Sequence, residues 1–251
     1  TNSFDATGSA RIYDTGPQGG KLTTFPLNDL LPGDGLASPR FRTMVKGDVP
    51  VAVASDRNYN FKPSDKWTFA ALLTNGWQRI AKPNKNLAPS FGSQIVYKPS
   101  EEASFNWSTF VGKEFNGTGF DMRYFSNLFF DQKWNSKWRT IAGFDLGVQK
   151  LSNNQSATWL SPVIIVQYEI HPKWQTAFRA EYYKDAKNVI IATSVPFETT
   201  GFSFNIDYLP NAKVKLRNEI RYLNNKNSVF GMEPNLMASS LFTTTSLSFE
   251  F

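Results

Sequence analysis

Cysteine is absent from the 251 residues, and histidine occurs once, as His171. The lack of cysteine excludes disulfides, cysteine-bound zinc and thiol catalysis, and it suits export through an oxidising periplasm. The chain begins Thr-Asn-Ser without a basic-then-apolar leader, as a mature exported protein would. Its longest clean aliphatic runs, such as residues 163–166, fall far short of the roughly 20 residues that a membrane helix needs. The sequence therefore predicts an exported protein without a transmembrane helix.

Sequence motifs for catalysis or ligand binding are also lacking. There is no G-x-S-x-G, no phosphate-binding glycine loop and no calcium-loop spacing. With one histidine, metal ligation would rest on carboxylates alone. The net charge is +6, but the lysines and arginines are dispersed rather than concentrated for nucleic acid. We expect no enzyme activity, cofactor, metal or nucleic-acid partner, and we interpret His171 as a turn residue.

Aromatic residues, by contrast, are abundant: they make up 15% of a chain whose mean hydropathy is only −0.37. Turn-like segments carrying an aromatic and a lysine recur along the sequence. Their markers Pro63, Pro99, Asn135, Pro172 and Pro210 are spaced by 36, 36, 37 and 38 residues. Each period consists of a strand, a longer polar loop, a strand and a short turn. The period therefore predicts a series of β-hairpins.

This pattern predicts ten strands, most of which reach the roughly 9–11 residues that a tilted strand needs to cross a bilayer. The predicted strands are 67–78, 91–98, 103–111, 120–131, 137–149, 158–170, 174–184, 199–209, 213–223 and 240–251. The connections 79–90, 185–198 and 224–238 are long and polar. We therefore expect short turns at one end of the strands and long loops at the other.

The first 56 residues depart from the repeat. Residues 16–20 and 31–35 are typical of loops, and only residues 9–13 and 49–61 are strand candidates. We expect a single domain, 1–251, in which 1–56 is irregular and loop-rich and 57–251 forms regular hairpins. Further strands are expected before these hairpins, giving an even total of 12 or more.

Apolar and polar residues alternate within the strands. In 213–223, Val214, Leu216, Ile220 and Tyr222 alternate with Lys215, Arg217, Glu219 and Arg221. Residues 137–149, 174–184 and 199–209 show the same period of two. Such alternation predicts a sheet with one wet and one apolar face. A soluble sandwich also alternates, so the pattern alone does not decide between sandwich and barrel.

Three further features favour a transmembrane antiparallel up-and-down β-barrel. Aromatics beside the short turns are typical of the girdles of membrane barrels. These aromatics are Trp67, Tyr97, Phe130, Trp138, Tyr168, Trp174 and Tyr208. Short turns alternate with long loops, and the last strand closes on Phe251 with alternate apolar residues, resembling a barrel-assembly signal. A propeller is disfavoured because its blades hold four strands per period.

Four segments carry a family resemblance: Pro63–Gln78, Gly143–Val148, Tyr168–Trp174 and Gly201–Tyr208. They resemble the OmpL-like β-barrel porin family of Bacteroidota, over about residues 57–251. The shared motifs are turn and strand patterns, so they bear on fold and location more than on substrate. The resemblance implies a pore of poorly defined specificity in the outer membrane of a Gram-negative cell.

Twelve charged residues fall on the inward, pore-lining side of the predicted strands. They are Asp121, Arg123, Arg139, Asp145, Glu169, Arg179, Glu181, Asp207, Lys215, Arg217, Glu219 and Arg221. Six of each sign predict mutual pairing across neighbouring strands and little net ion selectivity. Two roles stay open: bracing the interior, which we favour, or a selectivity constriction, for which 213–223 is the candidate positive wall.

Some apolar residues also fall on the inward side, namely Phe125, Phe129, Val163 and Ile165. They predict packing against an inserted loop or plug. The favoured function is passive diffusion of small hydrophilic solutes through a water-filled barrel in the lipid bilayer of the cell outer membrane. One alternative is a non-conducting barrel subunit that assembles with other outer-membrane proteins. Another is a soluble carbohydrate-binding β protein.

Overall fold

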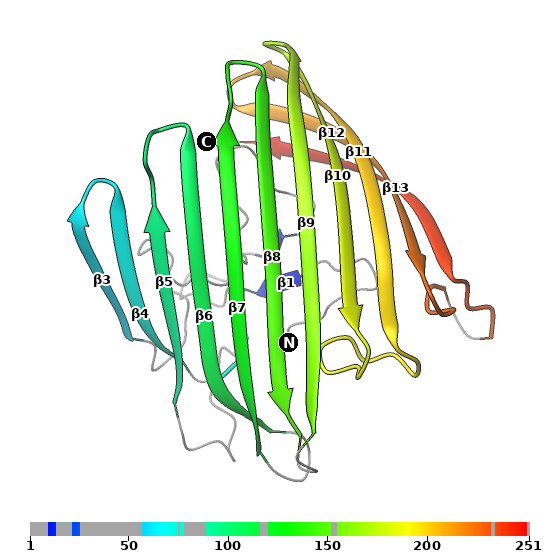
Figure 1. The fold of residues 1–251 in the computed structure, drawn as a ribbon. Coiled ribbons are helices and arrows are strands. Elements are labelled where there is room, and N and C mark those ends of the chain that lie inside the picture. The colour runs from blue at the N-terminus through cyan, green and yellow to red at the C-terminus, as the bar shows by residue number, and fades with distance from the viewer. Residues whose placement is uncertain are drawn as a thin grey trace. The chain divides into compact units, whose positions relative to one another are not determined.

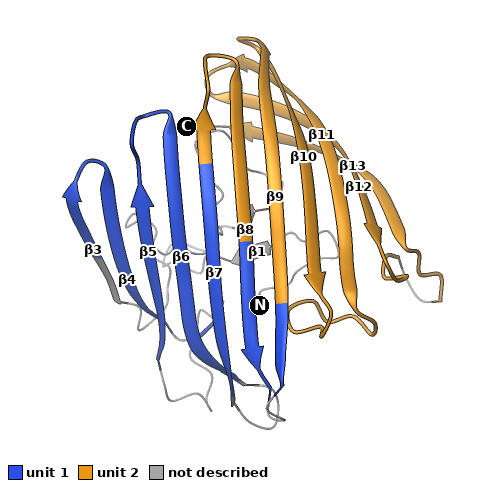
Figure 2. Cartoon of the chain, in the orientation of Figure 1, with its two compact units in different colours: residues 1–130, 145–158 blue, residues 131–144, 159–251 orange. Residues whose placement is uncertain are grey.

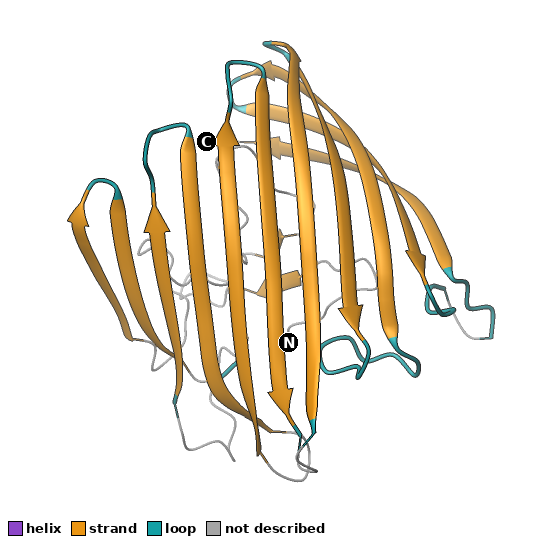
Figure 3. Cartoon of the chain, viewed as in Figure 1, coloured by secondary structure: helices purple, strands orange, loops and turns teal. Residues whose placement is uncertain are grey.

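The computed structural model describes residues 10–13, 22–25, 57–74, 76–77, 89–115, 120–151, 155–231 and 234–249. Every regular element in these ranges is a β-strand, joined by turns and loops (Figure 3). No helix in this part of the chain is long and apolar enough to span a membrane.

The described strands form two sheets, and β3 to β13 follow one another in chain order in the larger, 11-stranded one (Figure 1). The strands are β1 Ala10–Tyr13, β2 Leu22–Phe25, β3 Arg57–Ser64, β4 Trp67–Thr74, β5 Ser90–Tyr97, β6 Ala103–Phe115, β7 Phe120–Lys133, β8 Trp138–Lys150, β9 Ser156–His171, β10 Trp174–Asp185, β11 Phe197–Asn211, β12 Val214–Asn225 and β13 Ser239–Phe249. Strands β1 and β2 pair with each other. The result is an all-β, antiparallel, up-and-down fold.

The ten predicted strands correspond to β4 to β13. The candidate at 9–13 contains β1, the candidate at 49–61 overlaps β3, and β2 was not predicted. The predicted loops 16–20 and 31–35 and the terminal Phe251 lie outside the described residues, as do residues 49–56.

Several strand ends differ by up to four residues from the predicted ones, and two of these differences have a physical cause in the sequence. Strand β4 ends at Thr74 rather than at residue 78, because Gly76 adopts a φ of 131° that breaks an extended chain. Strand β11 continues through Pro210 to Asn211, where the sequence predicted a turn. A register shift between Tyr208 and Asn211 accommodates the proline, which has no N–H to give to the ladder.

The predicted alternation of short turns and long loops holds only in part. The turns at 65–66, 172–173 and 212–213 are short, and the connections 75–89, 186–196 and 226–238 are long. The connections 116–119 and 151–155 have only four and five residues, so strict alternation was wrong. Strands β6 to β9 are 13–16 residues long, so the strands in this part of the chain are long and the connections between them are short.

Burial along the strands is inverted relative to a soluble protein. On β11, the side chains of Phe202 and Phe204 are each 45% exposed, whereas Asp207 on the same strand is 1% exposed. Phe249 on β13 is 58% exposed, while Arg217 on β12 is buried. A soluble sandwich core would place the phenylalanines inside and the charges outside. We call the side with the exposed apolar residues the outward face and the opposite side the polar face.

The chain divides into two compact units (Figure 2). Unit 1 comprises residues 1–130 and 145–158, and unit 2 comprises residues 131–144 and 159–251. The polar face of each unit is described by itself below.

Candidate functional site

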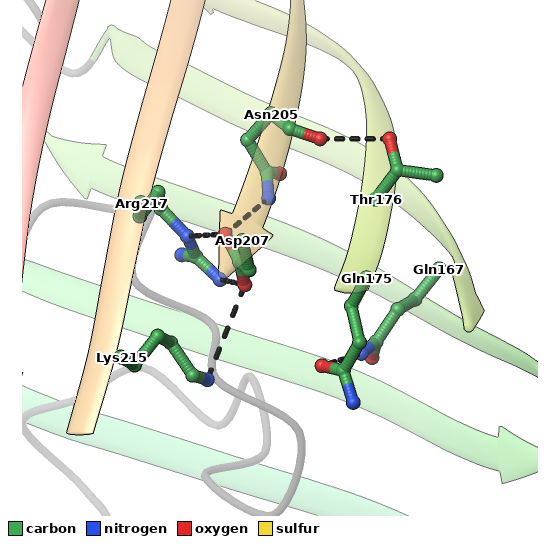
Figure 4. A network of polar contacts seen from close by, with 7 residues as sticks. All are labelled: Gln167, Gln175, Thr176, Asn205, Asp207, Lys215 and Arg217. Carbon is green, nitrogen blue, oxygen red and sulfur yellow. Dashed lines mark hydrogen bonds and ion pairs between the residues drawn. The ribbon is translucent and has the colours of Figure 1, made fainter. Parts of the chain in front are cut away.

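The polar face of unit 2 holds an ionic network centred on Asp207 (Figure 4). Arg217, directly opposite on β12, donates through Nε and Nη2 to the two carboxylate oxygens, at 2.7 Å each. The ammonium of Lys215 lies 4.0 Å from the same carboxylate, and the Asn205 amide donates to it at 2.8 Å. A bidentate arginine–carboxylate pair with these further contacts satisfies a carboxylate that is almost wholly buried.

A second network of unit 2 joins three charged residues of β10 and β12. Glu181 accepts hydrogen bonds from Arg179, two residues earlier on the same strand, and from Arg221 on β12. Strand β11 lies between β10 and β12, so the Arg221–Glu181 pair crosses a whole strand. Arg179 and Arg221 are both buried, so the carboxylate that they share offsets part of the cost of burying two positive charges.

Gly201 provides the space for this crossing. It lies on β11 directly between Glu181 of β10 and Leu223 of β12. A Cβ built on Gly201 would meet Glu181 Oε1 at 2.6 Å and Leu223 Cδ2 at 2.8 Å. A larger residue here would push Glu181 away from Arg221, so the glycine is needed for close approach rather than for its backbone conformation.

The remaining predicted residues of unit 2 lie on the same face. Arg139 pairs with Asp131 across the turn between β7 and β8. Glu219 is buried, and its Oε1 has no hydrogen-bond partner among the described residues. Glu169 is half-buried, and its backbone N–H donates to the Lys137 carbonyl at 2.9 Å.

The polar face of unit 1 is built mainly from amides and hydroxyls. Gln94 donates to Asn106 at 2.6 Å, and Asn106 donates to Ser108 at 3.0 Å. Asn127 donates to the predicted residue Asp145 at 2.6 Å. Asn106 and Asn127 each accept one hydrogen bond from an amide and donate another, so the three amides form a relay in which buried polar atoms satisfy one another.

Trp77 folds over the polar face of unit 1 just after β4 ends. Its backbone N–H donates to Glu114 at 2.6 Å, and its ring packs edge-on against Phe110 and Phe125. Arg123 lies 5.7 Å from the centre of the same ring. Trp77, in the connection after β4, thus packs over this face against Phe125, and the inserted loop or plug stays a prediction. Phe129 of unit 1 and Ile165 of unit 2 are buried, and Val163 of unit 2 is half-buried.

Arg123 and Asp121 are linked through Gln149. Arg123 donates to the Gln149 side-chain oxygen at 2.8 Å, and the Gln149 amide donates to Asp121 at 3.3 Å. The prediction of pairing across neighbouring strands holds for Asp207 with Arg217. It was incomplete elsewhere, because Glu181 binds one partner on its own strand and another two strands away.

Sequence reasoning missed several residues that complete these networks, chiefly Asp131, Gln149, Asn127 and Gly201. Asp131 and Asn127 share the parity of Asp121 and Arg123 on β7, so alternation could have found them. Gly201 could not be found in this way, because its importance depends on which residues of β10 and β12 flank it.

The outward face carries aromatic pairs at the strand ends beside the short turns, which we call the turn end. Their ring centroids lie 4.4 Å apart in Trp67–Tyr97, 4.8 Å in Phe105–Phe130, 4.6 Å in Trp138–Tyr168 and 4.7 Å in Trp174–Tyr208. Polar groups on this face bond to one another, as Asn218 and Thr245 do at 2.7 Å. Paired aromatic rings and mutually satisfied polar groups suit a face in contact with lipid.

The described residues contain no group of three or more His, Cys, Asp or Glu side chains placed to hold a metal ion. His171 ends β9, and its Nδ1 accepts the backbone N–H of Lys173 at 3.4 Å, in agreement with its interpretation as a turn residue. The arrangement instead offers two buried polar faces backed by an outward apolar surface.

Comparison with known proteins gives a family and a fold. A family model described as "Putative beta-barrel porin-2, OmpL-like" matches residues 58–251. An anion-selective porin from Comamonas acidovorans is similar in structure, with a TM-score of 0.58, 10% identity, and coverage of 78% of this chain and 57% of that one. OmpT, an outer membrane protein of Vibrio cholerae, gives a TM-score of 0.52, 11% identity, and coverage of 78% and 64%.

This chain therefore spans less than two thirds of the length of either porin. At such low identity, the likeness concerns the fold alone. A search of curated proteins returned no match to this sequence.

Proposed function

The chain belongs to the OmpL-like β-barrel porin family and lies in the outer membrane, and from this premise we propose that it admits small hydrophilic solutes by passive diffusion. The pore would be water-filled and lined by the polar faces. The proposal includes the twelve predicted charged residues as lining groups and residues 1–251 as a single barrel domain, of which 57–251 form the regular hairpins. Assignment of the chain to Bacteroidota stays a prediction.

One observation carries the proposal: polar side chains are buried and large apolar ones are exposed along the same strands. On β12, Ile220 and Tyr222 are 46% and 43% exposed, while Arg221 between them is 2% exposed. Water alone would not favour this arrangement, whereas lipid on one side and a polar interior on the other would. A lumen of this kind carries solutes without chemistry, which agrees with a non-enzymatic channel.

Conductance in planar lipid bilayers tests the proposal. Purified full-length chain should produce discrete steps of ionic current, and vesicles that contain it should swell in isotonic solutions of small sugars. A folded chain that inserts into the bilayer but passes neither ions nor sugars would rule out passive diffusion. Heat-modifiable migration in gel electrophoresis provides the control that the inserted chain is folded.

The depth of burial on the polar faces favours a second candidate, a non-conducting subunit of a larger outer-membrane complex. Asp207 and Arg221 are 1% and 2% exposed, and Trp77 lies over Phe110 and Phe125 in unit 1. Side chains buried to this degree are packed rather than bathed in a wide channel. Co-purification of a stoichiometric partner in mild detergent, together with absence of conductance, would support this candidate.

A further inference from the structure

The short turns of unit 2 repeat one backbone arrangement at its turn end. In each turn, the last residue before the next strand donates its backbone N–H to a side chain two positions earlier, a local bond that closes turns of this kind. The three bonds run from Lys137 to Asn135 Oδ1 at 2.9 Å, from Lys173 to His171 Nδ1 at 3.4 Å and from Lys213 to Asn211 Oδ1 at 2.9 Å. The three donors, which we call the turn lysines, thus occupy equivalent positions before β8, β10 and β12.

The turn lysines form a row of regular spacing, and all three side chains are exposed. Strands β8, β10 and β12 alternate with β9 and β11 in the sheet, so neighbouring turn lysines start about 10 Å apart, twice the distance between paired strands. The Lys137 carbonyl accepts the N–H of Glu169 at 2.9 Å, and the Lys173 carbonyl accepts that of Leu209 at 2.9 Å. These bonds hold the backbone in place, so a ligand would not have to order it.

Positive charge predominates at the turn end of unit 2. No Asp or Glu occurs in the three turns themselves, 134–137, 172–173 and 212–213. Glu169 lies across from Lys137, to whose carbonyl its N–H donates, and is half-buried. None of the turn lysines forms an ion pair with a described residue, whereas Asp131 and Asp207 on the adjoining strands are paired with arginines. Even with Glu169 counted in full, the row keeps a net positive charge, which complements an anionic partner.

The same turn bond in unit 1 presents a carboxylate. Glu102, directly before β6, donates its backbone N–H to Ser100 Oγ at 3.2 Å. The turn before β4 carries Lys66, but Asp65 beside it forms an ion pair with Lys62 at 3.2 Å. The turn arrangement itself does not require lysine, because only the backbone N–H takes part in it. The positive row is therefore a feature of unit 2 that turn formation does not explain.

The turn lysines face water rather than lipid. Trp138 and Trp174 follow two of them directly, and their rings pair on the outward face with Tyr168 and Tyr208. Such aromatic pairs mark the membrane interface. Because successive side chains of a strand alternate, the residue before each tryptophan has the parity of the polar face. Short turns of outer-membrane barrels lie on the periplasmic side, so the row is presented to the periplasm.

We propose that the turn lysines bind an extended acidic segment of a periplasmic partner protein. An unfolded chain in the polyproline II conformation has three residues per turn, so carboxylates at every third position lie on one side, about 9 Å apart. This spacing is close to that of the row. The lysine ammonium is a point charge on a flexible stem, which suits a partner without a shaped pocket. Each contact is weak in water, but contacts made by one segment reinforce one another. The binding does not depend on whether the lumen conducts.

Fluorescence anisotropy of a labelled peptide of eight glutamates, titrated with the full chain in uncharged detergent micelles, tests the proposal. The wild type should bind this peptide more tightly than a peptide of eight glutamines. The variant K137Q/K173Q/K213Q should bind it about tenfold more weakly. The matched variant K62Q/K66Q/K98Q, which changes the net charge equally at the turns of unit 1, should keep the wild-type affinity. No wild-type preference for the acidic peptide, or equal losses in the two variants, would overturn the proposal.

Lipid binding and misfolding are tested with the same variants. In nanodiscs that contain phosphatidylglycerol, the difference between the wild type and K137Q/K173Q/K213Q should persist, and its disappearance would assign the turn lysines to lipid phosphates instead. Heat-modifiable migration shows which variants fold. If the triple variant does not fold, K173Q alone should weaken binding about twofold, and an unchanged affinity would count against the proposal. Conductance of the wild type is recorded separately, so that failure of the pore and failure of peptide binding are distinct results.

Discussion

Unit 1 and unit 2 both bury polar side chains and expose apolar ones, but neutral amides have a larger part in the buried networks of unit 1, where they stand beside the buried charges Glu114, Asp121 and Arg123. In unit 1, Gln94, Asn106 and Asn127 pass hydrogen bonds along a relay of neutral amides. In unit 2, Asp207 and Glu181 are each shared by two cationic side chains. Each unit thus has an outward apolar surface, but the polar networks behind the two surfaces differ in composition.

The difference shows what each kind of interior demands of the sequence. An amide donates and accepts at once, so a relay can adjust when one member changes. A buried charge has no such freedom, because loss of its partner leaves the full desolvation cost of the remaining ion. Unit 2 should therefore be the more sensitive of the two to single substitutions on its polar face.

The largest effect is expected for Asp207→Asn. It removes the carboxylate that Arg217 and Lys215 share and leaves a neutral amide in a site that is almost fully buried. We expect the free energy of unfolding to fall by about 3–5 kcal/mol. Urea titration of the chain in lipid vesicles, followed by tryptophan fluorescence, measures this loss. A loss no larger than that of a unit 1 amide substitution would remove the contrast between the two units.

Substitution of an outward-facing apolar residue by arginine should lower the free energy of unfolding by similar amounts in the two units. Phe204 of unit 2 is 45% exposed and Leu128 of unit 1 is 51% exposed, each on an outward face. Phe204→Arg and Leu128→Arg should each destabilise the folded chain by about 2–4 kcal/mol in a bilayer. The same vesicle titration measures both variants. Little or no cost in one unit would show that its outward surface does not contact lipid.

An intermediate effect is expected for Gly201→Ala. The added methyl group would come within 2.6 Å of Glu181 Oε1 and separate Glu181 from Arg221. We expect a loss of about 1–3 kcal/mol from this overpacking. Ser203→Ala provides the control, because this buried neighbour on β11 already carries a Cβ. Equal stability of the two variants would show that the crossing of β11 does not depend on the glycine.

The smallest effect is expected in unit 1, for Asn127→Ala. This substitution removes the donor to Asp145 and one acceptor of Asn106, while the Gln94–Asn106 hydrogen bond remains. We expect a loss of about 1 kcal/mol, typical of a neutral hydrogen bond. Chemical unfolding under the conditions used for Asp207→Asn gives the comparison. A loss of 3 kcal/mol or more would show that the relay is as intolerant as the ionic networks.

The sequence was sufficient for the existence of β4 to β13 and for the side of the sheet on which their residues lie, although not for β2 or for every strand end. Successive side chains on a strand point to opposite faces, so the position of Arg217 or Phe204 follows from counting by twos. All twelve predicted charged residues lie on the polar side, as their parity required. The aromatic pairs at the turn end could also be anticipated, since each ring stands beside a recognisable turn.

The tertiary structure alone decided the partners. Contacts across strands depend on register, and a register is set by the pairing of two segments rather than by either one. Glu181 therefore reaches Arg221 over Gly201, and Gln149 stands between Arg123 and Asp121, although neither relation is visible in the sequence. Trp77 left its predicted strand because Gly76 turns the chain and Glu114 accepts its backbone N–H. The face on which a side chain lies is a local property of the backbone, whereas its hydrogen-bond partners depend on how strands distant in sequence pair.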